Sequence, residues 1–115
     1  MHELGIVFSI IRDVEEVAKE NRIDKVDGVR LRVGEVSTVI PYYLEDCWNW
    51  AVDRTDILKG AALHIDTVPA VTFCGGCQKT YPTVTYGKIC PHCGSEDTWL
   101  QQGDECVIQE IEVSE

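Results

Sequence analysis

Apolar residues near the beginning of the chain recur at the spacing of a helix with one buried face. Between Leu4 and Asn21 they follow one another mainly at steps of three and four residues, and most of the charged side chains fall off that stripe. The stripe consists of Leu4, Val7, Ile11, Val14 and Ala18. We therefore expect one amphipathic helix here, followed by a turn that reaches Gly28.

Alternating apolar and basic residues come next and predict a strand with one buried face and one wet face. They are Val29, Leu31 and Val33, with Arg30 and Arg32 between them. After Pro41, which suits the first turn of a helix, apolar residues return to helical spacing. The residues that predict this second helix are Leu44, Cys47, Trp48, Ala51 and Val52.

Two further alternating segments predict two more strands. One runs from Ala61 to Thr67 and stops before Pro69, because proline cannot donate to a strand ladder. The other has an acidic outer face and carries Val107, Ile111 and Val113 on its inner face. Two helices and three strands in this order predict an α+β fold, with the helices packed on a three-stranded sheet.

The segment between these elements has a different character. It holds most of the cysteines, several glycines and almost no periodic apolar pattern. A segment below roughly 40 residues usually needs a metal or disulfides in order to fold. We therefore predict two domains, one of residues 1–70 plus 104–115 and an inserted module of residues 71–103.

Two C-x-x-C pairs lie in this module, Cys74-Gly-Gly-Cys77 and Cys90-Pro-His-Cys93, with twelve residues between them. Each pair can bring two thiolates to one ion, and two such turns complete a tetrahedral zinc site with no open position. We expect a structural zinc ion held in this zinc-ribbon-like module by Cys74, Cys77, Cys90 and Cys93. Iron in a rubredoxin-like site would use the same thiolates, whereas redox chemistry is typical of a single pair at the start of a helix.

The remaining histidines and cysteines have plainer interpretations. His92 lies between two of the expected ligands, and we leave it outside the coordination shell. His64 falls on the polar side of its strand and is expected at the surface. Cys47 and Cys106 are expected to pack as small apolar side chains.

Charge and targeting signals narrow the classes of partner. Ten Lys and Arg against twenty Asp and Glu give a formal net charge of −10, which opposes binding to a phosphate backbone. No secretory signal or long apolar span is visible, so we expect a cytoplasmic protein with reduced cysteines and no membrane or nucleic-acid partner.

The tripeptide Met1-His2-Glu3 can bind a metal ion. The terminal amine of Met1, the next amide nitrogen and the imidazole of His2 can close two adjacent chelate rings. Tetragonal nitrogen and oxygen donors suit Ni(II) and Cu(II), and Glu3 could add a carboxylate oxygen. By itself this tripeptide is unremarkable in most proteins.

Several motifs together resemble the HypA (also HybF) family of nickel metallochaperones. They are the opening Met1-His2-Glu3, the Val33-Gly34-Glu35 that ends the first strand, the two C-x-x-C pairs, and the closing Gly103-Asp104-Glu105 with Ile108-Gln109-Glu110-Ile111-Glu112-Val113. The resemblance covers nearly the whole chain and is far more specific than any single motif.

The resemblance implies a nickel carrier that catalyses no reaction. Nickel would be bound by His2 with the neighbouring backbone nitrogens and Glu3, then delivered during maturation of [NiFe]-hydrogenase or urease. A HypB-type GTPase and the hydrogenase large subunit are the implied partners, and a homodimer is a further expectation. Some members add an acidic ligand in the loop after the Gly-Glu pair, whereas residues 36–41 contain none here. Glu35 or Glu45 could substitute.

Two other classes of function compete with this interpretation. A zinc ribbon that binds nucleic acid or a protein would be expected to carry a basic, aromatic surface. Between Phe73 and Gly103 the cations are only Lys79 and Lys88. An enzyme using the cysteines would need an open metal position or a thiolate beside a histidine base, and the spacing predicts neither.

Overall fold

The computed structural model describes residues 3–114, which divide into two compact units. The first unit contains the described residues up to Arg32, Val39–Asp66 and those from Val107 onwards. The second unit contains Val33–Thr38 and Thr67–Cys106. The last two residues of the first strand and the short segment after it thus belong with the cysteine-bearing part of the chain.

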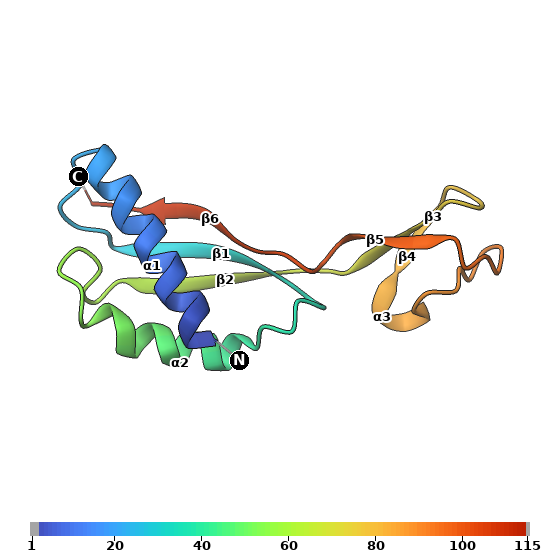
Figure 1. Ribbon diagram of the computed structural model, residues 1–115, viewed down its shortest axis with the longest axis horizontal. Coiled ribbons are helices and arrows are strands. Elements are labelled where there is room, and N and C mark those ends of the chain that lie inside the picture. The colour runs from blue at the N-terminus through green and yellow to red at the C-terminus, as the bar shows by residue number, and fades with distance from the viewer. Residues whose placement is uncertain (1–2, 115) are drawn as a thin grey trace. The chain divides into compact units, whose positions relative to one another are not determined.

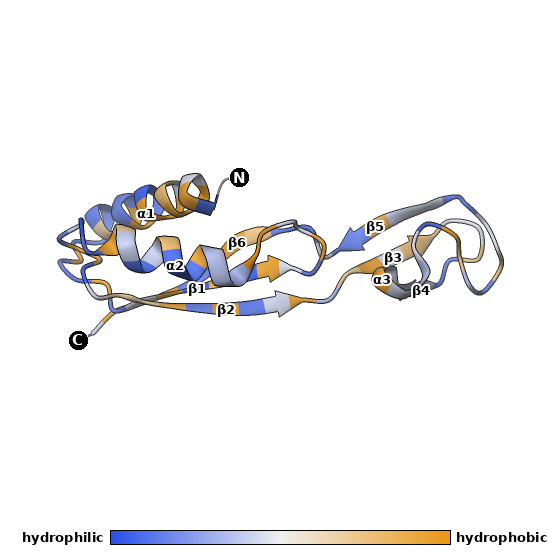
Figure 2. Cartoon of the chain, turned by 90° about the horizontal axis from the view of Figure 1, so that it is seen from below, coloured by the Kyte–Doolittle hydropathy of each residue, from blue (hydrophilic) through white to orange (hydrophobic). Residues whose placement is uncertain are grey.

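In the first unit, two helices cover one face of a three-stranded sheet of order β2-β1-β6 (Figures 1 and 2). This arrangement, with its inserted four-cysteine module, confirms the predicted α+β fold class. The elements are α1 (Glu3–Glu20), β1 (Gly28–Gly34), α2 (Pro41–Val52), β2 (Ala62–Val68) and β6 (Cys106–Glu112).

The core of this unit is built from the predicted apolar stripes, with one change in α1. Leu4 was expected in the buried stripe but is 40% exposed, and Ile10 is buried in addition to the others. Leu4 lies in the first turn of α1, ahead of the first buried residue of the stripe, Val7. The fully buried side chains of largest volume include Trp48, Leu31, Leu44, Leu58, Val7 and Val14.

The third predicted strand exists, but its inner face is less buried than expected. Val107 and Val113 are 49% and 44% exposed, and only Ile111 of the three is half-buried. β6 forms an edge of the sheet, and Val113 lies beyond its last residue, Glu112.

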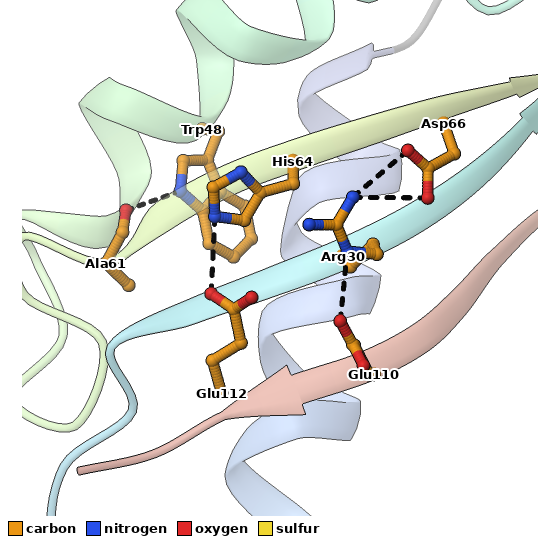
Figure 3. Close-up of polar contacts among 7 residues, drawn as sticks. All are labelled: Arg30, Trp48, Ala61, His64, Asp66, Glu110 and Glu112. Atoms are coloured by element: carbon orange, nitrogen blue, oxygen red, sulfur yellow. Dashed lines mark hydrogen bonds and ion pairs between the residues drawn. The ribbon is translucent and has the colours of Figure 1, made fainter.

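The sheet face away from the helices carries a network of charged side chains (Figure 3). Arg30 of the central strand binds Asp66 of β2 through Nη1 and Glu110 of β6 through Nε, both at 3.0 Å. Beside them, Nε2 of His64 lies 3.2 Å from Glu112. These pairs are partly exposed, so each contributes little to stability. They pair the charged side chains on the solvent-exposed face of the sheet with one another.

The second unit contains a small sheet that the sequence pattern did not predict. Its strands are β3 (Val71–Cys74), β4 (Thr80–Pro82) and β5 (Thr98–Gln102), and a one-turn helix, α3 (Thr83–Tyr86), follows β4 (Figure 1). The sheet has the order β4-β3-β5, and both pairings are antiparallel. Its strands are too short for an alternating pattern to stand out, which explains the miss.

Gly34 and Gly103, which belong to two of the motifs named in the sequence analysis, lie side by side in this unit. A Cβ on Gly34 would lie 2.0 Å from the carbonyl oxygen of Gly103, and a Cβ on Gly103 would lie 2.4 Å from Cα of Ala70. Gly103 also has a φ of +117°, which residues with a side chain rarely adopt. Only glycine therefore allows these backbones to approach so closely.

Candidate metal sites

The four cysteines come from two turns of similar construction in the second unit. Cys74 ends β3 and its carbonyl accepts a bond from the N–H of Gln78 at 2.8 Å. The carbonyl of Cys90 accepts the same kind of bond from Gly94, also at 2.8 Å. Gln78 and Gly94 both have positive φ, at 61° and 75°. Each C-x-x-C is thus followed by a residue that bends the backbone around the sulfurs.

The sulfurs of these turns converge on one point. Sγ of Cys74 lies 3.6 Å from Sγ of Cys93, and Sγ of Cys77 lies 3.7 Å from Sγ of Cys90. All four sulfurs lie within 4.8 Å of one another, and among the described residues they form the one such group of potential metal ligands.

These separations fit a tetrahedral ion. Zinc–sulfur bonds of about 2.3 Å at tetrahedral angles place sulfurs about 3.8 Å apart. A disulfide would require about 2.05 Å, and all six cysteines are free thiols. The donor set and the spacing therefore suit zinc, and four thiolates leave no position for a substrate.

Hydrogen bonds from backbone N–H groups favour the thiolate form of one of the cysteines, Cys90. Burial raises the pKa of Cys90, but N–H bonds from Cys93 and His92, together with contacts from the thiols of Cys77 and Cys74, outweigh it and lower that pKa to about 7. The bond from the His92 N–H measures 3.3 Å. A bond from Ser95 lowers the pKa of Cys93, but the neighbouring thiols, Cys74 first, together with burial raise it to about 12. The cluster therefore binds protons and a cation in competition, as expected of a thiolate site.

Aromatic packing supports the cluster on one side, and this support was missed in the sequence. Tyr81 is buried against Cys74 and Cys90, with Cys77 packed at the edge. Its hydroxyl donates to the carbonyl of Gly87 at 2.9 Å, which ties β4 to the segment that carries Cys90. The signal in the sequence was an aromatic residue between two turn-forming segments, which is too weak to assign a role.

The second candidate site lies at the beginning of the chain, and most of it falls outside the described residues. Met1 and His2 are not described, so only Glu3 is placed, as the first residue of α1. Oε2 of Glu3 accepts a long bond of 3.4 Å from the N–H of Ile40, the residue before α2. The carboxylate of Glu3 thus lies beside the loop that precedes α2.

The two carboxylates considered as substitutes differ in environment. Glu35 accepts a bond from the N–H of Ala70 at 2.8 Å, and its own N–H donates to Val68 at 2.9 Å. Glu35 therefore has a structural role within the second unit. Glu45 is exposed on α2.

The remaining expected positions are as follows. His64 is partly exposed and bound to Glu112, and His92 is exposed. Cys47 and Cys106 are half-buried, and burial raises the pKa of the Cys106 thiol, which keeps it protonated. Neither thiol belongs to the four-sulfur group. Among the described helices, none has both the length and the apolar composition needed to cross a membrane.

Comparison with known proteins gives one consistent result. The family model for HypA, described as hydrogenase/urease nickel incorporation, metallochaperone, matches residues 1–113. The hydrogenase maturation factor HypA of Actinobacillus succinogenes is 34% identical over 113 residues, covering 98% of this chain and 99% of that protein. The hydrogenase maturation factor HybF of Morganella morganii is 33% identical over 112 residues, covering 97% and 98%.

A solved structure agrees with these relatives. The nickel metallochaperone HypA from Helicobacter pylori, solved in solution, superposes with a TM-score of 0.73 at 26% identity and covers 97% of each chain. The family match spans nearly the whole chain, and the relatives are as long as the chain itself. The chain therefore belongs to the HypA family of nickel metallochaperones for hydrogenase maturation.

Proposed function

We propose that this chain carries Ni(II) on its first three residues and delivers it during maturation of [NiFe]-hydrogenase or urease. The ligands are the amine of Met1, the next amide nitrogen and the imidazole of His2, with Glu3 as an oxygen donor. The family membership supports nickel as the cargo, and the chemistry of the tripeptide supports the ligand set.

The four-cysteine cluster has a different role in this proposal. Cys74, Cys77, Cys90 and Cys93 hold one structural zinc ion that folds the inserted module, as their convergence and spacing support. A closed thiolate cage would release its ion poorly, whereas a few donors at a chain end can be displaced one at a time by a recipient. The chain is thus a carrier and not an enzyme.

The partners follow from this role. A HypB-type GTPase in the cytoplasm assists the transfer, and the large subunit of [NiFe]-hydrogenase receives the ion. The acidic surface of the chain is unsuited to nucleic acid. The single observation that carries the proposal is the match of the nickel-incorporation family to residues 1–113, which includes His2.

Calorimetric titration of Ni(II) into untagged protein tests the proposal. We expect stoichiometric binding by the parent chain and its loss in His2→Ala, with circular dichroism and zinc content unchanged. His64→Ala is the matched control, because it removes a histidine that lies on the sheet face and should leave binding intact. Equal nickel binding by His2→Ala and the parent chain would refute the assignment.

A further inference from the structure

The edge strands of the two sheets differ in how well they are protected. An unpaired edge can bind another extended chain, and proteins block it with charged residues, proline or very short strands. Three of the four edges have such protection: His64 and Asp66 in β2, Glu110 and Glu112 in β6, and Pro82 in the three-residue β4. The fourth edge, β5, reads Thr-Trp-Leu-Gln-Gln and has no charge and no proline.

A cavity of about 330 Å³ lies beside this unprotected edge. Thr98 and Leu100 of β5 and Thr72 of β3 contribute to its wall, and the pairing of Thr72 with Leu100 and Cys74 with Thr98 places all three on one face of the sheet. Val36, Thr83, Gly87, Lys88 and Glu96 line it from other segments. Its size is near the lower end of the range for ligand pockets, about 300 to 1,000 Å³.

The hydroxyls of the three threonines in the cavity wall are already hydrogen-bonded. The hydroxyls of Thr72 and Thr83 bind each other at 2.6 Å, and the hydroxyl of Thr98 donates to the carbonyl of Lys88 at 2.6 Å. The threonines therefore leave mainly their methyl groups for a guest, next to Leu100 and Val36. A wall of this kind suits an aliphatic side chain.

Acidic residues flank β5 at both ends. Glu96 and Asp97 immediately precede the strand, and Asp104 and Glu105 follow it after one glycine. The bare edge thus lies between two pairs of carboxylates. A chain bound along this edge would be stabilised by basic residues at its two ends.

We propose that β5 and the adjacent cavity bind an extended peptide segment of a partner protein, with an aliphatic side chain at its centre and Lys or Arg toward both ends. The backbone of the segment pairs with the free edge of β5, which gives affinity. One of its alternate side chains enters the cavity, which gives specificity.

A second copy of this chain is a poorer occupant of the same edge. If two β5 strands paired antiparallel, Glu96 and Asp97 of one copy would approach Asp104 and Glu105 of the other. Juxtaposed like charges oppose such pairing. The charge pattern therefore favours a basic partner over self-association.

The test uses the zinc-loaded full chain without nickel and three synthetic nonapeptides. One has two lysines at each end and a central leucine among threonines and valines, the second has glutamates in place of the lysines, and the third has proline in place of leucine. We expect the lysine peptide to shift the amide signals of residues 98–102. The glutamate and proline peptides should bind at least about tenfold more weakly.

Two matched variants locate the binding edge. Gln101→Lys adds a charge to β5, and Gln109→Lys adds the same charge to β6, where both glutamines are exposed. We expect Gln101→Lys to weaken the lysine peptide by at least about tenfold and Gln109→Lys to have little effect. Equal effects of the two variants, or equal binding of all three peptides, would overturn the proposal.

Two other outcomes are also decisive. A dimer in light scattering that Gln101→Lys dissociates would show that a second copy occupies the edge, which overturns the partner assignment. Peptide binding depends on the proposed zinc site only because β5 lies in the module that the zinc ion would fold. Zinc content is therefore measured for every sample, and absent peptide binding in a chain that contains one zinc refutes this inference and leaves the zinc and nickel proposals standing.

Discussion

Trp48 shows at the scale of one residue how the first unit combines packing with a specific polar contact. Its side chain is fully buried, and Nε1 donates to the carbonyl of Ala61 at 2.9 Å (Figure 3). Trp50, two residues further along α2, is 48% exposed and contacts Phe8 and Arg54 at the surface. Two tryptophans on one helix thus have opposite environments, and helical periodicity distinguishes them in advance.

This contrast makes a prediction about stability. Trp48→Phe leaves the carbonyl of Ala61 without its donor and a gap where the larger ring packed, so we expect the free energy of unfolding to fall by about 1–3 kcal/mol. Trp50→Phe removes no buried hydrogen bond and keeps an aromatic ring at a half-exposed position, so its effect should stay below about 0.5 kcal/mol. Urea unfolding followed by circular dichroism measures both, and similar losses in the two variants would contradict this account.

At the scale of an element, the segment 33–38 is held in the second unit by backbone bonds. The N–H of Gly34 donates to Glu105 at 2.6 Å, and that of Val36 donates to Gly103 at 2.8 Å. The N–H of Gly103 in turn donates to Oε1 of Glu105 at 2.7 Å. The Val-Gly-Glu and Gly-Asp-Glu motifs are therefore joined by backbone hydrogen bonds within this unit.

Gly103→Ala should disrupt the hydrogen bonds that join these two motifs. The added Cβ would meet the backbone of Ala70, and the positive φ adds strain, so we expect a loss of roughly 2 kcal/mol or more in unfolding free energy. Gly5→Ala is the control, because Gly5 lies in α1 with nothing within 4 Å of an added Cβ. It should stabilise the helix by up to about 1 kcal/mol. If thermal unfolding gave both variants the same midpoint, the steric argument would fail.

The same elements show what the sequence could and could not predict. Long periodic segments such as α1 and β1 were predictable because one face is buried along most of their length. The strands of the second unit were not, because Thr80–Pro82 and Val71–Cys74 are too short to show a period. The convergence of the cysteines was predictable from spacing, since two C-x-x-C turns can reach one ion. The packing of Tyr81 depends on tertiary contacts that no local pattern reports.

At the scale of the whole molecule, the two units depend on different sources of stability. The first unit has a continuous apolar core that includes Leu31, Leu44 and Trp48. In the second unit, the buried cluster around the proposed zinc ligands consists of Cys74, Tyr81 and Cys90, with Cys77 packed against it. So small a cluster supplies little hydrophobic free energy, and the proposed zinc ion must supply most of the rest.

Cys77→Ser should therefore unfold one unit and spare the other. We expect zinc content to fall well below the one ion per chain of the parent protein, because three thiolates no longer close the site. Trp99 packs on Phe73 in the second unit, with 5.1 Å between the ring centroids. Its indole N–H signal in NMR spectra should therefore move to the position of an unfolded chain. The indole signal of Trp48 should stay dispersed, since its bond to Ala61 lies within the first unit.

Cys47→Ser is the matched control, because Cys47 is a half-buried cysteine of α2 outside the four-sulfur group. Loss of both indole signals in Cys77→Ser would show that the first unit cannot fold without the second, and retention of one zinc per chain would show that Cys77 is not a ligand.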